Sequence, residues 1–211
     1  MNKADINFNC IGKQILQGST VEKTRATWED GKSAGTRAVF FTKTDYDLAT
    51  EFPISQQRKQ YWKNAIREML WIHQQHSNNV NDLGLKIWDQ WADENGSIGK
   101  AYGYQAGLVY EWEDTPEPMT QVERVLYLLK HNPASRRMYI TFINNKDITK
   151  KNLQECLHTV EFTVLDGKLH MVAYQRSGDF LVASGPGGYN EIQYAALQLM
   201  IAHCSGFEPG T

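Results

Sequence analysis

Apolar residues recur at helical spacing in four stretches of the chain and alternate with polar residues in four others. The helical stretches are residues 1–20, 60–75, 120–130 and 190–203, and the alternating ones are residues 36–42, 138–143, 159–165 and 168–175. A period near 3.6 predicts an amphipathic helix, and a period of two predicts a strand. Gly18 closes the first helix, and Asn132-Pro133 follows the third. The pattern predicts one α+β domain over residues 1–211, with helices packed on an antiparallel-leaning sheet.

Each predicted helix has an apolar face that we expect to be buried. The expected inward residues are Ile6, Phe8, Ile11, Ile15 and Leu16 in the first helix, and Ile192, Ala195, Ala196, Leu199 and Met200 in the last. Glu68 lies inside an apolar run of the second helix. Most helix glutamates are solvated, but a carboxyl held among apolar side chains has a raised pKa and exchanges protons near neutrality.

Two of the predicted strands are joined by Asp166-Gly167, a dipeptide that favours a tight hairpin turn. Antiparallel pairing about this turn places Cys156, just before the first strand, across from Arg176, just after the second. The pKa of a thiol, roughly 8.5, falls beside a fixed positive charge, and only the thiolate is a good nucleophile. A lone cysteine near a strand is more often a small buried hydrophobe. Arg176 and Asp179 together are more often a surface ion pair.

The composition mainly excludes classes of protein and kinds of site. The chain has 211 residues, is 41% hydrophobic and carries a net charge of −2, so it can bury a core but has no overall field favouring nucleic acid or membrane. Its three cysteines are widely spaced, which argues against disulfides and zinc. No leader-like or bilayer-spanning apolar run is present. We expect a cytoplasmic protein that binds neither nucleic acid nor membrane.

Aromatic and basic residues supply four further candidates. Trp88 and Tyr102 lie in aromatic segments, for which core packing is the usual explanation and a stacking wall for a flat ring is the alternative. Arg136 and Arg137 precede a predicted strand. Adjacent arginines are ordinarily solvated, but a pair at a strand entrance can also grip a phosphate in bidentate fashion.

Taken together, these segments resemble the thymidylate synthase family, from about residue 10 to the end of the chain and in the family's order. The segments that carry the resemblance are Arg25, Arg67-Glu68-Met69-Leu70-Trp71, Ile87-Trp88-Asp89-Gln90-Trp91, Gly99-Lys100-Ala101-Tyr102-Gly103-Tyr104-Gln105, Asn132-Pro133-Ala134-Ser135-Arg136-Arg137, Cys156, Arg176-Ser177-Gly178-Asp179, and Asn190 with Gln193-Tyr194. No single segment is specific for the family, but their order along the chain is. The resemblance implies an α+β, thymidylate synthase-like fold with a mainly antiparallel or mixed sheet, and a homodimer formed sheet to sheet.

The resemblance also implies a reaction: reductive methylation of dUMP to dTMP, with 5,10-methylenetetrahydrofolate as cosubstrate and no metal. Cys156 would add to C6 of uracil and make C5 nucleophilic. Arg176 would favour the thiolate, while Glu68 and Tyr102 would manage proton movement. Asp179 is carried over both as a catalytic residue and, with Trp88, as a contact to the folate.

Nucleotide binding is implied in the same way. Four arginines would hold the phosphate, Arg25 and Arg176 from one subunit and Arg136 and Arg137 from the other. Ser177 would assist them. Asn190 would pair its amide with uracil O4 and N3–H, a donor and acceptor pattern opposite to that of cytosine.

The chain departs from the family in three places. Leu157 follows Cys156 where many relatives have histidine, and the loop 180–189 is long and glycine-rich. The chain ends at Thr211, before the expected C-terminal strand and tail, which suggests a truncated product or different work at the site. Two alternatives therefore stand beside the synthase: a pyrimidine nucleotide hydroxymethylase acting on dUMP or dCMP, and an inert nucleotide-binding or dimerisation homologue.

Overall fold

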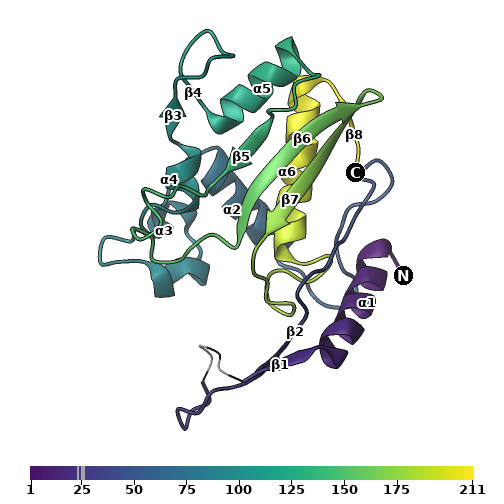
Figure 1. Cartoon of the computed structure of the whole chain (residues 1–211), viewed down its shortest axis with the longest axis vertical. Coiled ribbons are helices and arrows are strands. Elements are labelled where there is room, and N and C mark those ends of the chain that lie inside the picture. Colours follow the sequence, from purple (N-terminus) through teal and green to yellow (C-terminus); the bar gives the residue numbers. More distant parts are fainter. Residues whose placement is uncertain (23, 25–26) are drawn as a thin grey trace.

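The fold is organised around a four-stranded sheet, seen in Figure 1, which shows a computed structural model describing residues 1–22, 24 and 27–211. Its strands run in the order β5 (Tyr139–Thr141), β6 (Leu157–Leu165), β7 (Lys168–Gln175) and β8 (Glu208–Pro209). The β5–β6 and β6–β7 pairs are antiparallel, and the β7–β8 pair is parallel. The sheet is therefore mixed, with a mainly antiparallel character, as expected.

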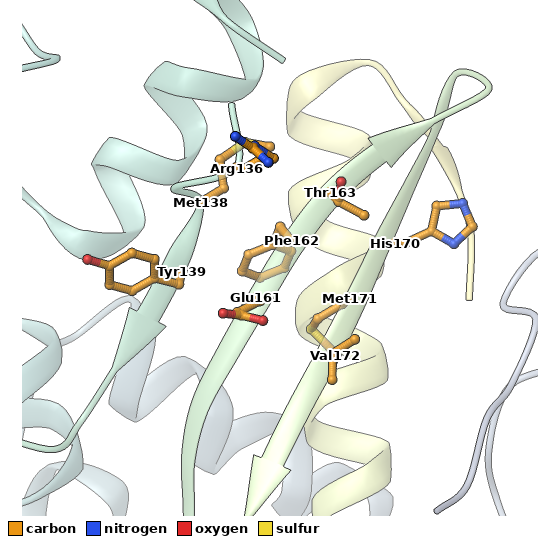
Figure 2. A pocket seen from close by; sticks show the side chains of 9 residues that line it. All are labelled: Arg136, Met138, Tyr139, Glu161, Phe162, Thr163, His170, Met171 and Val172. Carbon is orange, nitrogen blue, oxygen red and sulfur yellow. The ribbon is translucent and has the colours of Figure 1, made fainter. Parts of the chain in front are cut away.

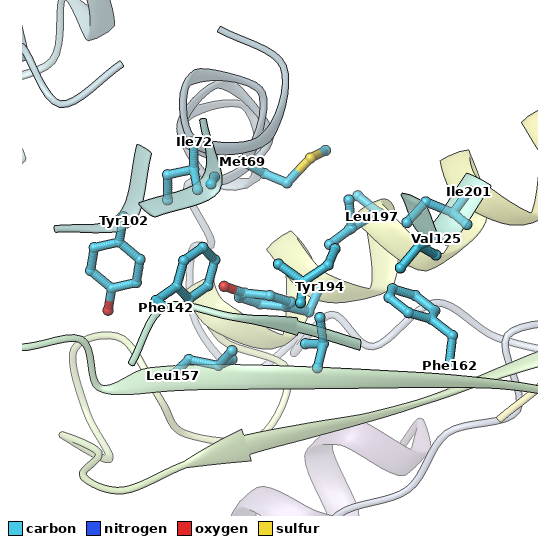
Figure 3. Close-up of a cluster of buried hydrophobic side chains, with 14 of the residues drawn as sticks. Met69, Ile72, Tyr102, Val125, Phe142, Leu157, Phe162, Tyr194, Leu197 and Ile201 are labelled. Carbon is cyan, nitrogen blue, oxygen red and sulfur yellow. The ribbon is translucent and has the colours of Figure 1, made fainter. Parts of the chain in front are cut away.

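Three long helices, α2 (Trp62–His73), α5 (Gln121–His131) and α6 (Tyr189–Ser205), lie on one side of this sheet. The core is formed between these two layers, where Figure 3 shows side chains of the helices meeting those of the strands. The remaining elements are α1 (Lys3–Gln17), β1 (Ser19–Val21), β2 (Thr36–Ala38), α3 (Val80–Leu83), a 3₁₀ helix η1 (Lys86–Trp91), α4 (Tyr102–Ala106), β3 (Val109–Tyr110) and β4 (Met119–Thr120). Within the described residues, no helix is long and apolar enough to span a bilayer.

The predicted hairpin is confirmed. Asp166 and Gly167 both have positive φ, 51° and 76°, as a type I′ turn requires. Strand β6 begins at Leu157, two residues earlier than expected, and its register with β7 shifts between Leu157 and Thr159. This irregularity lies directly after Cys156. A local shift of register turns the strand and re-aims the residues beside it.

The helix ends also follow the sequence. Thr120 and Glu123 form a capping box at the start of α5, which ends at His131, before Pro133. Helix α6 closes on Gly206, whose φ of 75° is the left-handed conformation that favours glycine. The inward face expected for α6 is only partly right: Met200 is 43% exposed, whereas Leu197 and Ile201 are buried. Because α6 packs against α2, α5 and the sheet, more than one of its sides is covered.

The N-terminal region differs most from expectation. Helix α1 ends at Gly18 as predicted, but Ile6 and Leu16 are 53% and 68% exposed. Its anchor is instead the buried Asp5, whose Oδ1 accepts hydrogen bonds from Ser55 Oγ at 2.8 Å and from the Gln56 amide at 2.9 Å. The strand expected at residues 36–42 is reduced to β2, which pairs with β1 in an exposed two-stranded ribbon. A short apolar run therefore did not suffice to place that segment in the core.

Candidate active site

The β6–β7 hairpin brings Cys156 and Arg176 together. The Arg176 amide donates to the Cys156 carbonyl at 2.9 Å. The guanidinium of Arg176 donates through Nε to the Glu155 carbonyl and through Nη2 to the Gln154 carbonyl, both at 2.9 Å. The half-buried Cys156 is thus preceded by two peptide groups that are bonded to one arginine. The guanidinium is held against the segment that carries the thiol.

Tyr102 approaches the same cysteine from the other side. The Cys156 amide donates to Tyr102 Oη at 3.0 Å. Tyr102 is 8% exposed and makes edge contacts with Trp88 and Phe142. Burial is the main reason that its pKa is raised; the hydrogen bond from the Cys156 amide acts in the opposite direction, and the nearby acidic groups add to the rise. The hydroxyl therefore stays protonated at neutral pH and can donate a hydrogen bond while it accepts one.

Glu68 is the buried acid of the site. It is 6% exposed, and burial raises its pKa to about 7, while Tyr189, Gln193 and Trp88 act in the opposite direction. A carboxyl with this pKa is protonated in part of the molecules at neutral pH and can both accept and release a proton. Tyr189 Oη and Gln193 Nε2 are buried and make no hydrogen bond of normal geometry to a described residue. Two buried polar groups, the Tyr189 hydroxyl and the Gln193 amide, therefore lie close to the Glu68 carboxyl.

Asn190 opens α6 at the mouth of the same region. Its amide N–H donates to the Ala183 carbonyl at 2.9 Å, and its Nδ2 lies 3.4 Å from both Gln175 Oε1 and Ser184 Oγ. These contacts orient the side chain. An asparagine amide has two N–H donors and an oxygen acceptor. Both donors have an acceptor within 3.4 Å here, so a ring edge that takes one of them replaces a long contact.

Ser177 and Asp179 are exposed in the loop after Arg176. Asp179 Oδ1 accepts from the amides of Leu181 at 2.9 Å and Val182 at 3.0 Å, which makes Asp179 the residue that shapes this turn. Trp88 is 8% exposed and packs against other aromatic rings of the core. The structure places Trp88 beside Glu68 rather than on an open wall, and a contact between Trp88 and the folate stays a prediction.

Arg136 and Arg137 are not brought to this site. The Phe162 amide donates to the Met138 carbonyl at 2.8 Å, so the arginine pair precedes β5 near the far end of β6 from Cys156. At about 3.3 Å per residue, that end of the strand is about 20 Å from the thiol. Figure 2 shows Arg136 just before the start of β5, in a view with α6 behind the sheet. Arg25 lies outside the described residues.

Several neighbours of the site were given no role from the sequence, although Gln193 belongs to a segment that carries the resemblance. They are Lys151, Gln154, Glu155, Gln175, Ser184, Tyr189 and Gln193. Tyr189 and Gln193 share a helix face at i, i+4 spacing beside Asn190, so helical periodicity was a usable signal for both. Lys151 and Glu155 have the same spacing but lie in an irregular segment, where no such rule applies. No group of three His, Cys, Asp or Glu in the described part of the chain could hold a metal ion.

A half-buried thiol beside an arginine, a tyrosine hydroxyl and a proton-exchanging acid suits an enzyme that works through covalent catalysis. The family model described as thymidylate synthase matches residues 7–211. A thymidylate synthase of Bacillus subtilis subsp. natto is 38% identical over 100% of this chain and 76% of its own length. The thymidylate synthase of Bacillus phage phi3T is 37% identical with the same coverage.

A solved structure gives the same result. The thermostable thymidylate synthase A from Bacillus subtilis superposes with a TM-score of 0.92 at 38% identity, covering 99% of this chain and 76% of that one. This chain belongs to the thymidylate synthase family. The expected family and fold are thereby confirmed.

Proposed function

We propose that this chain converts dUMP to dTMP by reductive methylation, with 5,10-methylenetetrahydrofolate as cosubstrate. Membership of the thymidylate synthase family supports this reaction over the hydroxymethylase and the inert homologue. One observation carries the proposal for the site itself. Cys156 is half-buried, follows two carbonyls bonded to the Arg176 guanidinium, and donates its amide to a tyrosine hydroxyl.

The chemistry assigned to these residues follows from what each can supply. The Cys156 sulfur attacks C6 of the uracil ring, forming a carbon–sulfur bond and moving the ring electrons toward C5 and O4. Arg176 holds the segment that carries the sulfur, through the Gln154 and Glu155 carbonyls. Glu68, with its pKa near 7, exchanges protons with the ring through its half-protonated carboxyl. When bound, the folate supplies the one-carbon unit and the hydride.

Recognition of the base is assigned to Asn190. Its Nδ2 contacts to Gln175 and Ser184 are both long, at 3.4 Å, so the amide can exchange one of them for O4 and offer its oxygen to N3–H. Ser177 and Arg176 would meet the phosphate. Asp179 would face the folate, because only one of its carboxylate oxygens accepts bonds from the described residues of its own loop.

We also propose that the active protein is a homodimer joined through the outer sheet face. Tyr139, Val172 and Tyr174 on this face are 38%, 53% and 43% exposed, and Figure 2 shows the first two with Glu161 between them. Arg136 and Arg137 lie about 20 Å along β6 from their own Cys156, by the rise of an extended strand. A partner packed on this face would receive these arginines for its phosphate site.

The whole chain is proposed to be one catalytic domain that acts in the cytoplasm. One continuous core links α2, α5, α6 and the sheet. Cys10, Cys156 and Cys204 are all free thiols, as expected in a reducing compartment.

The reaction is tested by incubating the protein with dUMP and methylenetetrahydrofolate and identifying both products. We expect dTMP and dihydrofolate in equal amounts. A hydroxymethylated nucleotide with tetrahydrofolate would identify the alternative enzyme. Binding of 5-fluorodeoxyuridylate without a covalent adduct at Cys156 would favour the inert homologue.

The sharing of arginines is tested with hybrid dimers. Arg136→Ala and Cys156→Ser are each expected to be inactive alone, because each lacks one half of every site. Mixed dimers contain one site with both residues intact, so their activity should recover to about a quarter of the wild-type value after statistical mixing. Verified hybrids with no recovery would count against sites built from two chains.

A further inference from the structure

A buried ion pair lies directly before the proposed nucleophile. Lys151 Nζ is 2.8 Å from both carboxylate oxygens of Glu155, and the two side chains are 1% and 0% exposed. Lys151 Nζ also donates to the Phe142 carbonyl at 3.0 Å. Its three N–H groups thus have three acceptors, which is the full capacity of an ammonium group.

This pair cross-links a segment without regular secondary structure. Residues 151–155 lie between β5 and β6 and make no strand ladder or helix of their own. The segment is held at its start, where the Lys100 amide donates to the Lys150 carbonyl at 3.0 Å. Gly99 packs so closely there that a Cβ would lie 2.8 Å from the Lys150 oxygen. The ion pair continues this attachment to the residue next to Cys156.

Glu155 is connected through its backbone to the catalytic groups. Its carbonyl accepts from Arg176 Nε at 2.9 Å, and the next amide, that of Cys156, donates to Tyr102 Oη at 3.0 Å. The position of the Glu155 side chain therefore affects two backbone groups: the Glu155 carbonyl, which binds Arg176, and the Cys156 amide, which binds Tyr102.

Stability gives no sufficient reason for burying these charges. Desolvating a lysine and a glutamate costs more than their attraction returns in many proteins, and apolar replacements of similar volume are often as stable or more so. Placing a charged pair in such a site specifies one geometry, because a misplaced partner leaves a buried charge unpaired.

We propose that Lys151 and Glu155 are positioning residues that fix Cys156 relative to Arg176 and Tyr102. This inference rests on the proposed function of Cys156. It assigns to the pair two effects: the ammonium cancels the buried charge of Glu155, the residue next to Cys156 in the chain, and the cross-link holds the Glu155 carbonyl where Arg176 reaches it. A misplacement of about 1 Å at a reacting group can cost about 100-fold in rate.

The two single substitutions test the charge effect by its sign. Lys151→Met leaves the Glu155 anion unpaired near the thiol, so Cys156 should need a higher pH for alkylation by iodoacetamide. Glu155→Gln leaves the Lys151 cation, so the same midpoint should move to lower pH. The other charged or titrating groups around the thiol are Arg176, Tyr102, Glu68 and Tyr194, and all four are present in both variants. A purely structural role would move both midpoints in the same direction or neither.

The experiment uses the full chain carrying Cys10→Ser and Cys204→Ser, because both of these thiols are exposed and would also react. Lys150→Met is the matched control: it removes the neighbouring lysine, which is 59% exposed and 3.6 Å from Asp147. The readouts are the pH midpoint of alkylation, the rate of adduct formation with 5-fluorodeoxyuridylate and methylenetetrahydrofolate, and the Kd for dUMP.

We expect opposite midpoint shifts and adduct formation slowed about 100-fold in both single variants, with the Lys150→Met control unchanged. Because either single variant can fail to fold, the double variant Lys151→Met/Glu155→Leu supplies a version without buried charge. This double variant should fold but form the adduct at least about tenfold more slowly than the parent, because the link from Phe142 through Lys151 to Glu155 is lost.

The proposal would be overturned if the double variant formed the adduct at the parental rate. It would also be overturned if the single variants were less stable but kept the parental alkylation midpoint and adduct rate. If the parent forms no adduct, the proposed function of Cys156 fails instead. The alkylation profile, which needs no folate, would still decide whether the pair controls the thiol.

Discussion

Glu68 and Glu155 are two buried glutamates near one cysteine, and their surroundings give them different properties. Glu68 is 6% exposed on α2, with neutral residues around it, and burial raises its pKa to about 7. Glu155 is fully buried in the β5–β6 connection and receives two bonds of 2.8 Å from Lys151. The two glutamates differ in whether a cation is present. Glu68 has none beside it and is suited to proton exchange, whereas Glu155 is paired with Lys151 and is suited to holding a position.

The comparison shows how the same residue type can take two roles in one active site. Desolvation alone favours the neutral form of a carboxyl, whereas a bonded ammonium favours the charged form. Glu68, whose pKa is raised, lies among Tyr189, Gln193 and Trp88, and the Glu155 carboxylate lies against a lysine. Four substitutions or conditions would break or sharpen this contrast.

The largest effect is expected where both glutamates are proposed to act, at Cys156. Cys156→Ser should lower kcat by at least about 10⁴-fold, because a hydroxyl is a far weaker nucleophile than a thiolate. The Tm should change by no more than about 2 °C, since the half-buried side chain keeps its size. Steady-state dTMP formation and a thermal melt measure the two quantities. A serine variant of near wild-type activity would refute the assignment.

The next largest effect is expected on the free energy of unfolding when Lys151, the partner of Glu155, is replaced. Lys151→Met should lower the free energy of unfolding by about 3–5 kcal/mol, because it leaves a buried carboxylate unpaired. Lys151→Met/Glu155→Leu should recover most of that loss, since no charge remains in the site. Urea titrations of both variants beside Lys150→Met supply the comparison. Equal loss in the single and double variants would show that packing, not charge, is responsible.

Glu68→Gln should act in the opposite sense, with a loss of activity and little loss of stability. A glutamine keeps the shape of the carboxyl but cannot exchange a proton, so kcat should fall about 100-fold or more. Because the amide is neutral, its burial avoids the cost of an ionised group. Turnover and unfolding are measured together, with the exposed Glu94→Gln as control. Retained activity would remove Glu68 from the proton pathway.

The smallest expected effect is a dependence of stability on pH from Glu68. Its pKa is raised from 4.5 to about 7 in the folded chain, so the native state binds the proton more tightly than the unfolded state. This stabilisation is present below pH 4.5 and is lost as pH rises through about 7. The loss is about 3 kcal/mol at 1.36 kcal/mol per pKa unit.

The measurement is the free energy of unfolding in urea at several pH values, for wild type and Glu68→Gln. The difference between the two proteins should narrow at acidic pH and open in favour of the variant above neutrality. Parallel curves would mean that Glu68 titrates normally in the folded chain.

The sequence was sufficient for most regular elements near the site. The hairpin followed from Asp166-Gly167, and the helical stretches predicted at residues 120–130 and 190–203 correspond to α5 and α6, with α5 ending before Pro133. It failed in part for the N-terminal segment, where Ile6 and Leu16 of α1 are exposed although Ile11 is buried, and where the strand at residues 36–42 is only three residues long. Apolar periodicity indicates which face a neighbour can cover, but not whether a neighbour is there.

What the sequence determined by itself was local: helix periods, caps, the Asp-Gly turn, and therefore the meeting of Cys156 with Arg176 across the hairpin. Each of these depends on residues close in the chain and on backbone conformations that few residues favour. The tertiary structure alone decided that Glu68 is buried without a cation, that Glu155 is buried with one, and that Arg136 lies far from its own thiol. Desolvation and pairing depend on what distant segments bring to a site, and that information is not contained in local pattern.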